Sequence, residues 1–259
     1  LNTQNSTLPP MANFILLQET ESTNTYLSQV ADTMPSGTVI YTSNQLLGRG
    51  QRGNFWESEP NKNLTFSYLL KGTNLKPHEQ FLISEAVSLA IVHALEDAAS
   101  DMLGRFTIKW PNDIYYEDKK VCGILIEHVL LGDGIKHSVV GVGMNVNQEV
   151  WVSGAPNPIS LKQITKMQYD VDDLLKKVVE KIEEECELAS FTKADFENLH
   201  QEYLGNLYRY DAEYHEFVLP DGTRIKAKIT NVEPAGFLHL EHDDGTEHSY
   251  AFKEIAFVI

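Results

Sequence analysis

The chain has 259 residues, 42% of them hydrophobic, which is enough to bury a sizeable core and to form one large domain with a smaller one. It carries 21 Lys and Arg against 37 Asp and Glu, a formal net charge of -16, and this negative field disfavours DNA or RNA as a partner because their phosphates require a basic surface. No stretch of about 18 apolar residues is present, so the sequence predicts no membrane-spanning helix.

Two features of the sequence bear on the compartment. The N-terminus lacks the basic and apolar regions of a signal peptide, and Cys122 and Cys186 stand among apolar residues. Buried thiols are therefore favoured over a disulfide, a metal site or a nucleophile, and they suit a reducing compartment. We expect a cytoplasmic protein in which the polar residues 1–12 form a disordered leader.

Predicted strands and helices are mixed up to residue 145, and four successive strands follow the second helix. Ser22–Asn24 offer capping side chains before a short helix, and Pro77 opens a long helix with an apolar face. Gly141 and Gly143 in the last strand indicate a close backbone approach. The predicted helices cover 22–31 and 77–99, and the predicted strands cover 14–17, 38–42, 64–70, 106–110, 114–116, 121–130 and 137–145.

The character of the sequence changes after Gly205. An irregular segment at 148–158 and two helices, 171–189 and 193–203, precede this point. Short strands with the turn signals Asp221–Gly222 and Asp244–Gly245 follow it, which is typical of a small β-barrel. These strands are predicted at 214–219, 224–232, 237–241 and 249–252.

The segment Gly48–Asn54 places three glycines and two arginines directly after a predicted strand. Glycine allows a backbone to approach a ligand closely, and arginine donates forked hydrogen bonds to phosphate or carboxylate. A cationic loop on an acidic protein suits a small anionic ligand. A flexible basic turn is the alternative interpretation.

Two other polar clusters stand at strand ends or turns. Ser22–Asn24 is one, and Lys109–Asp113 with Lys120 is the other. Taken singly, each has a plain structural interpretation as a helix cap, a turn or a hairpin surface. Taken with the glycine loop, they supply neutral hydrogen-bonding groups, cations and a carboxylate that can hold Mg²⁺.

The order of these motifs resembles that of biotin protein ligases. The resemblance covers about residues 14–147, and the combination of ordered motifs is far more specific than any one of them. The matching segments are Glu21-Ser22-Thr23-Asn24, Gln45 with Gly48-Arg49-Gly50, Trp56, Lys109-Trp110-Pro111-Asn112-Asp113, Lys119-Lys120-Val121-Cys122-Gly123-Ile124-Leu125-Ile126-Glu127 and Gly141-Val142-Gly143-Met144-Asn145.

The resemblance implies an α+β fold. A mixed sheet covered by helices, as in class II aminoacyl-tRNA synthetases, is expected for residues 13–208, and an SH3-like barrel for residues 209–259. It also implies a two-step reaction in which biotin and ATP give biotinyl-5′-adenylate, whose acyl group passes to a lysine of a biotin carboxyl carrier domain. Because few residues precede the first strand, we expect the monofunctional type, without a DNA-binding domain, acting as a monomer or homodimer.

The family's site residues carry over onto matching positions of this sequence. Lys120, Arg49 and Asp113 are implied as catalytic, with Asp113 a ligand for the Mg²⁺ that accompanies ATP. Biotin would contact Ser22, Thr23, Gln45, Gly48, Arg49, Lys120 and Gly123. The nucleotide would contact Arg49, Gln51, Arg52, Trp56, Asn112 and Asn145.

The sequence departs from the family pattern at Gln51, where relatives often carry arginine. We hypothesise that this chain retains its adenylate differently, unless Arg52 supplies the missing charge. Two other functions stay open at this point. One is a lipoate ligase or octanoyl transferase, which shares the fold, and the other is a non-catalytic biotin-binding regulator.

Overall fold

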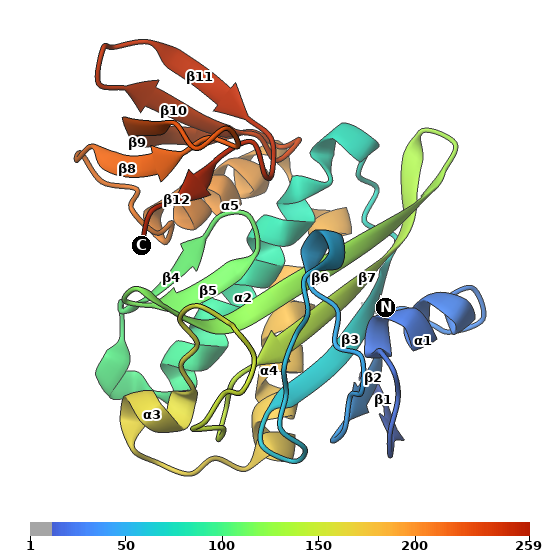
Figure 1. Cartoon of the computed structure of the whole chain (residues 1–259). Coiled ribbons are helices and arrows are strands. Elements are labelled where there is room, and N and C mark those ends of the chain that lie inside the picture. The colour runs from blue at the N-terminus through green and yellow to red at the C-terminus, as the bar shows by residue number, and fades with distance from the viewer. Residues whose placement is uncertain (1–11) are drawn as a thin grey trace.

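The computed structural model describes residues 12–259, so nearly all of the predicted leader, residues 1–12, lies outside the described part. The described residues form two sheets (Figure 1). The strands of the large sheet run in the order β1-β2-β3-β7-β6-β5-β4, and those of the small sheet in the order β11-β10-β9-β8-β12. The predicted α+β fold class is confirmed.

The large sheet is mixed, because β1 pairs with β2 in parallel and its other neighbouring pairs are antiparallel. Its longest strands are β6 and β7, which form a hairpin that projects beyond the body of the molecule (Figure 1). The strands are β1 (Asn13–Leu17), β2 (Thr38–Thr42), β3 (Leu64–Lys71), β4 (Phe106–Lys109), β5 (Asp113–Tyr116), β6 (Lys119–Leu131) and β7 (Gly134–Met144).

Helices pack on both faces of this sheet. Strand alternation turns Tyr68 and Val140 toward the core that contains α2 (Phe81–Ala98) and α4 (Val171–Glu185). The intervening residues Leu69 and Val139 pack against Leu27 of α1 on the opposite face. The remaining helices are α1 (Thr23–Val30), α3 (Leu161–Thr165) and α5 (Lys193–Gly205).

A small antiparallel sheet follows α5, where the SH3-like domain was predicted. Its apolar residues, such as Phe217 and Leu240, belong to the same continuous core as α2. The loop before β10 is held to the large domain by two hydrogen bonds, Phe81 N to Pro234 O at 3.0 Å and Trp110 Nε1 to Gly236 O at 3.1 Å. The strands are β8 (His215–Val218), β9 (Arg224–Val232), β10 (Leu238–His242), β11 (Glu247–Tyr250) and β12 (Ala256–Phe257).

Some predicted boundaries were wrong. The helix predicted over 77–99 is divided into a 3-10 turn at Pro77–Glu79 and α2. The helix predicted over 171–189 ends at Glu185, and the short elements α3 and β12 were not predicted. Across residues 12–259, no helix has both the length and the apolar character that crossing a membrane requires.

Candidate active site

A cavity of about 470 Å³ lies where the large sheet meets the small domain. Of the predicted site residues whose side chains the structure describes, all except Gly48 and Asn145 line it, so Arg49 and Lys120 share one cavity. The side chain of Arg52 lies outside the described part of the structure. The lining residues fall within 22–24, 45–56, 65–66, 109–125, 141–143, 218–220 and 252–257.

One end of the cavity is a cluster of buried, neutral polar groups near the start of α1. The Oε1 atom of Gln45 accepts hydrogen bonds from Thr23 N at 2.9 Å and from Thr23 Oγ1 at 3.4 Å. Ser67 Oγ lies 2.8 Å from Thr23 Oγ1 and 2.5 Å from Asn24 Oδ1. The hydroxyl of Ser22 also accepts a hydrogen bond from Thr25 N, so Ser22 caps α1 as the plain structural interpretation predicted. This end can bind a neutral polar group without carrying charge.

Position 141, beside this cluster, has no room for a side chain and must be glycine. A Cβ at position 141 would collide with the carboxamide of Asn24, which is buried against the strand. Asn24 Nδ2 donates to Leu125 O at 3.1 Å and to Glu127 Oε2 at 3.0 Å. The close backbone approach predicted for this glycine is therefore confirmed.

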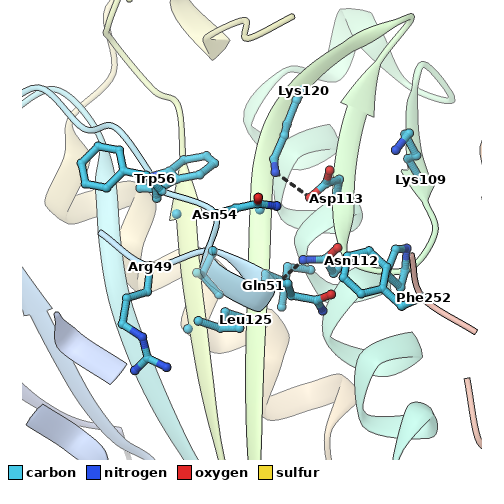
Figure 2. A pocket seen from close by; sticks show the side chains of 18 of the residues that line it. Arg49, Gln51, Asn54, Trp56, Lys109, Asn112, Asp113, Lys120, Leu125 and Phe252 are labelled. Atoms are coloured by element: carbon cyan, nitrogen blue, oxygen red, sulfur yellow. Dashed lines mark hydrogen bonds and ion pairs between the residues drawn. The ribbon is translucent and has the colours of Figure 1, made fainter. Parts of the chain in front are cut away.

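The glycine loop closes one side of the cavity. Gly48 accepts a backbone hydrogen bond from Trp56 N at 2.9 Å, which holds the two ends of the loop together. The guanidinium of Arg49 forms an ion pair with Glu127 at 2.6 Å and donates to Thr25 Oγ1 at 3.1 Å. In Figure 2 this guanidinium points away from Lys120. Arg49 thus lines the cavity while its charge is engaged with Glu127.

Lys120 and Asp113 form an ion pair on the neighbouring strands β6 and β5, with Lys120 Nζ 2.6 Å from Asp113 Oδ1 (Figure 2). Both side chains are largely shielded, with 29% and 17% of their surfaces exposed. Lys120 Nζ also lies 5.4 Å from the centre of the Trp56 ring, a cation–π distance. The ammonium group of Lys120 is therefore held inside the cavity before a ligand binds. It can exchange Asp113 for an anionic ligand.

Trp56 packs against a second glycine of β7. A Cβ on Gly143 would collide with the Trp56 ring, so only glycine allows this contact. The Nε1 atom of Trp56 is buried and has no hydrogen-bond partner among the described residues. A buried donor without a partner is costly, and this one is available to a ligand in the cavity.

The two predicted asparagines have different positions. Asn112 lines the cavity and donates from Nδ2 to Ile124 O at 2.6 Å. Asn145 is buried outside the lining, and its Nδ2 donates to the carbonyls of Lys120 at 3.3 Å and Ile159 at 3.2 Å. Asn145 therefore supports the backbone of Lys120, and its contact with a nucleotide stays a prediction.

Sequence reasoning did not assign two parts of the cavity. Lys109 lines it, and burial lowers the pKa of this lysine below its ordinary value. The small domain supplies a wall that includes Pro220 and Phe257. Lys109 belonged to a recognised motif and could have been assigned, whereas no local pattern connects residues after 209 with the glycine loop.

The cavity has a suitable place for Mg²⁺. Asp113 is the carboxylate among the described lining residues, and no cluster of three metal-binding side chains occurs within residues 12–259. Mg²⁺ is commonly held by one or two carboxylates together with phosphate oxygens and water. Asp113 fits a metal that arrives with a nucleotide better than a metal held by the protein alone.

Both cysteines are free and buried, as predicted. Burial raises the pKa of the Cys122 thiol well above its ordinary value, so Cys122 remains protonated. A protonated thiol is a poor nucleophile. The chemistry of this cavity therefore depends on oxygen and nitrogen groups.

Comparison with known proteins identifies relatives of this arrangement. The model of the biotin/lipoate A/B protein ligase family matches residues 16–145. The bifunctional ligase/repressor BirA of Bacillus subtilis is 28% identical over 230 residues, which cover 84% of this chain and 65% of the relative. The biotin–[acetyl-CoA-carboxylase] ligase of Paracoccus denitrificans is 30% identical over 167 residues, which cover 62% of this chain and 67% of the relative.

A solved structure is similar over almost the whole chain. The biotin protein ligase from Aquifex aeolicus in complex with biotin and ATP superposes with a TM-score of 0.74 at 27% identity, covering 94% of this chain and 97% of that one. The chain thus matches one solved ligase over nearly its full length, but spans about two thirds of the Bacillus relative.

Proposed function

Because the chain belongs to the biotin/lipoate A/B protein ligase family, we propose that it activates biotin with ATP and transfers the biotinyl group to a lysine of a biotin carboxyl carrier domain. The observation that carries this proposal is the layout of the cavity. A neutral polar cluster stands at one end, and the Lys120–Asp113 ion pair lies further along the cavity.

Biotin suits the neutral end of the cavity. Its ureido group has two donors and one acceptor and no charge, and the groups around Thr23, Gln45 and Ser67 offer matching hydrogen bonds. Lipoate and octanoate have no comparable polar head. They would offer no hydrogen bonds to these groups, which the protein pairs with one another, and would therefore gain less at this end of the cavity than biotin does. The cluster therefore favours biotin over lipoate or octanoate.

In the first step, the biotin carboxylate attacks the α-phosphorus of ATP. Two negative groups approach each other, so cations that strengthen their contacts in the transition state lower the barrier. Lys120 can turn from Asp113 to the reacting oxygens. Arg49 contributes only if its guanidinium leaves Glu127, and we propose that the ligand carboxylate induces this exchange. Mg²⁺ bound to ATP and Asp113 would neutralise phosphate charge.

In the second step, the amine of the carrier lysine attacks the biotinyl carbonyl and AMP leaves. Lys120 remains on the phosphate and stabilises the charge of the leaving AMP. Asp113 then lacks its internal partner. We propose that it attracts the ammonium group of the incoming lysine and accepts a proton from it, so that the neutral amine attacks the acyl carbon while AMP leaves.

One experiment separates the three functions. The protein is incubated with ATP, Mg²⁺ and a biotin carboxyl carrier domain, together with biotin, lipoate or octanoate, and the carrier is weighed by mass spectrometry. A biotinyl mass increase that requires ATP supports the proposal. A lipoyl or octanoyl increase supports the related ligases, and biotin binding without any increase supports a regulator.

We propose a cytoplasmic monomer or homodimer that acts as a ligase without repressor function. Size-exclusion chromatography with light scattering determines the oligomeric state. A band-shift assay of the full-length natural protein, with and without biotin and ATP, tests the repressor alternative. A specific complex with promoter DNA would contradict the monofunctional type.

A further inference from the structure

The positive charges around the cavity are distributed unevenly. The described lining side chains of the glycine loop that approach its interior include the neutral Gln51 and Asn54, and the guanidinium of Arg49 is engaged with Glu127. The opposite side carries Lys120 and Lys109. A bound nucleotide with several negative charges would therefore find most of its cationic contacts on the side of β4, β6 and the small domain.

Lys109 has an unusual environment for a lysine. Its Nζ lies 5.3 Å from the centre of the Tyr115 ring and 4.8 Å from the centre of the Phe257 ring. Among the side chains that the structure describes, none forms an ion pair with it, whereas Lys120 has Asp113. Ring faces attract a cation but do not neutralise its charge, and the nearby Asp113 carboxylate, which pairs with Lys120, acts on Lys109 only from beyond ion-pair distance. Lys109 is thus a half-buried cation that is ready to accept an anion.

The order of groups along the cavity assigns that anion. Arg49 contacts α1 and marks one end, Lys109 lies at the other end, and Lys120 lies between them (Figure 2). If biotin occupies the end near α1, its carboxylate reaches the α-phosphorus near Lys120. In phosphoryl and nucleotidyl transfer the attacking and leaving oxygens lie roughly in line. The leaving group is then directed away from α1, toward Lys109.

We propose that Lys109 is a catalytic residue that binds the pyrophosphate leaving group, and that Phe257 of the small domain positions its ammonium group. This inference rests on the proposed function. A carboxylate oxygen of biotin forms a bond to the α-phosphorus, and the bond from that phosphorus to the oxygen bridging to the β-phosphorus breaks. The electron pair stays on the bridging oxygen, and Lys109 compensates the charge that develops on pyrophosphate.

The two half-reactions should therefore differ in their dependence on Lys109. Adenylate formation releases pyrophosphate and requires Lys109, whereas biotinyl transfer releases AMP and does not. The test uses the full chain in two assays. One measures biotin-dependent pyrophosphate release from ATP, and the other measures transfer from synthetic biotinyl-5′-adenylate to a carrier domain.

Lys109→Gln should lower the rate of pyrophosphate release about 100-fold, as for loss of one charge-stabilising group in a transition state. Transfer from synthetic adenylate should stay within about 2-fold of the wild type, and Lys109→Arg should restore part of the first activity. Lys119→Gln, at the exposed first residue of β6, is the matched control and should leave both activities unchanged. Unaltered pyrophosphate release, or equal losses in both assays, would overturn the proposal.

Phe257→Leu tests the positioning role because it keeps apolar volume and removes the ring face. Loss of a cation–π contact predicts a decrease of about 3- to 30-fold in pyrophosphate release. The ring favours the charged amine, so its removal should also move the basic limb of the pH–rate profile to lower pH. An unchanged profile contradicts this role. A wild-type protein inactive in both assays contradicts the proposed function itself.

Discussion

Lys120 Nζ lies 2.6 Å from Asp113 Oδ1, so the lysine implied to contact the reacting oxygens is held by a carboxylate before any ligand binds. Register explains the contact. Asp113 pairs with Gly123 on β6, and a bulge in the β5–β6 pairing brings Lys120 opposite Tyr115. The absence of a side chain at Gly123 leaves room for the lysine to cross toward Asp113, since a Cβ there would lie 3.1 Å from Lys120 Nζ.

Lys120→Ala should reduce adenylate formation by about 1,000-fold, the upper range for loss of one electrostatic contact at a reacting centre. Biotin-dependent pyrophosphate release measures the effect, and circular dichroism checks the fold. Asp113→Asn keeps the shape of the side chain but removes its charge, so it should reduce both pyrophosphate release and transfer to the carrier lysine. Full adenylate formation by Lys120→Ala would refute the role of this lysine.

Gly141→Ala should weaken biotin binding selectively. The new Cβ displaces the Asn24 carboxamide and disrupts its contacts with Ser67, Leu125 and Glu127. Because buried hydrogen bonds of this kind are worth about 1–3 kcal/mol, the KM for biotin should rise at least about 10-fold. Steady-state kinetics with varied biotin provides the measurement.

The matched control for this prediction is Gly154→Ala. Gly154 lies in a loop with no atom within 4 Å of an added Cβ, so its KM for biotin should equal that of the wild type. If Gly141→Ala also leaves the KM unchanged, Asn24 has no part in forming the biotin end of the cavity.

Gln51→Arg should slow the release of biotinyl-5′-adenylate. Gln51 lines both the main cavity and an adjoining cavity of about 280 Å³, so it stands at the junction between them. A guanidinium at this position would add charge-assisted hydrogen bonds to phosphate and reduce the release rate about 10-fold or more. Release of radiolabelled adenylate into excess unlabelled ligand gives the rate.

Gln201→Arg is the control for the added charge, since Gln201 is exposed on α5. It should release the adenylate at the wild-type rate. Equal rates for Gln51→Arg and the wild type would show that position 51 does not determine retention.

His93 predicts a pH dependence of stability. Its Nδ1 lies 3.0 Å from Glu185 Oε1 and its Nε2 lies 3.1 Å from Glu202 Oε1, so the ring connects α2 with the end of α4 and with α5. The hydrogen bond to Glu185 raises the pKa of His93 above its ordinary value of 6.5, although burial opposes this effect. Because the folded protein binds this proton more tightly than the unfolded chain does, protonated His93 stabilises the fold. This contribution is complete below pH 6.5 and is lost as the pH rises through the folded-state pKa.

The difference in Tm between the wild type and His93→Gln should therefore be larger near pH 6 than near pH 8.5. Thermal unfolding by circular dichroism at both pH values measures it. His78→Gln provides a control, because His78 is exposed and forms no ion pair within residues 12–259. A pH-independent difference for His93→Gln would mean that the protonated ring contributes nothing to stability.

The errors in predicted boundaries have physical causes. The apolar periodicity of α4 continues through Cys186 and Leu188, which are buried although the helix has ended, so the pattern extended the predicted helix too far. The helix α3 begins with a capping box of Ser160 and Gln163, a signal present in the sequence but hidden beside a segment rich in proline and glycine. The two-residue strand β12 exists only through its pairing with β8.

The sequence by itself determined the strands of the large sheet, the positions that must be glycine and the motifs whose order identifies the family. These properties depend on alternation, backbone freedom and residue type, all of which are local. Only the tertiary structure decided that Arg49 pairs with Glu127 and that Lys109 lies against Phe257. The direction of a charged side chain depends on which partners the fold brings near it, and these partners come from distant parts of the chain.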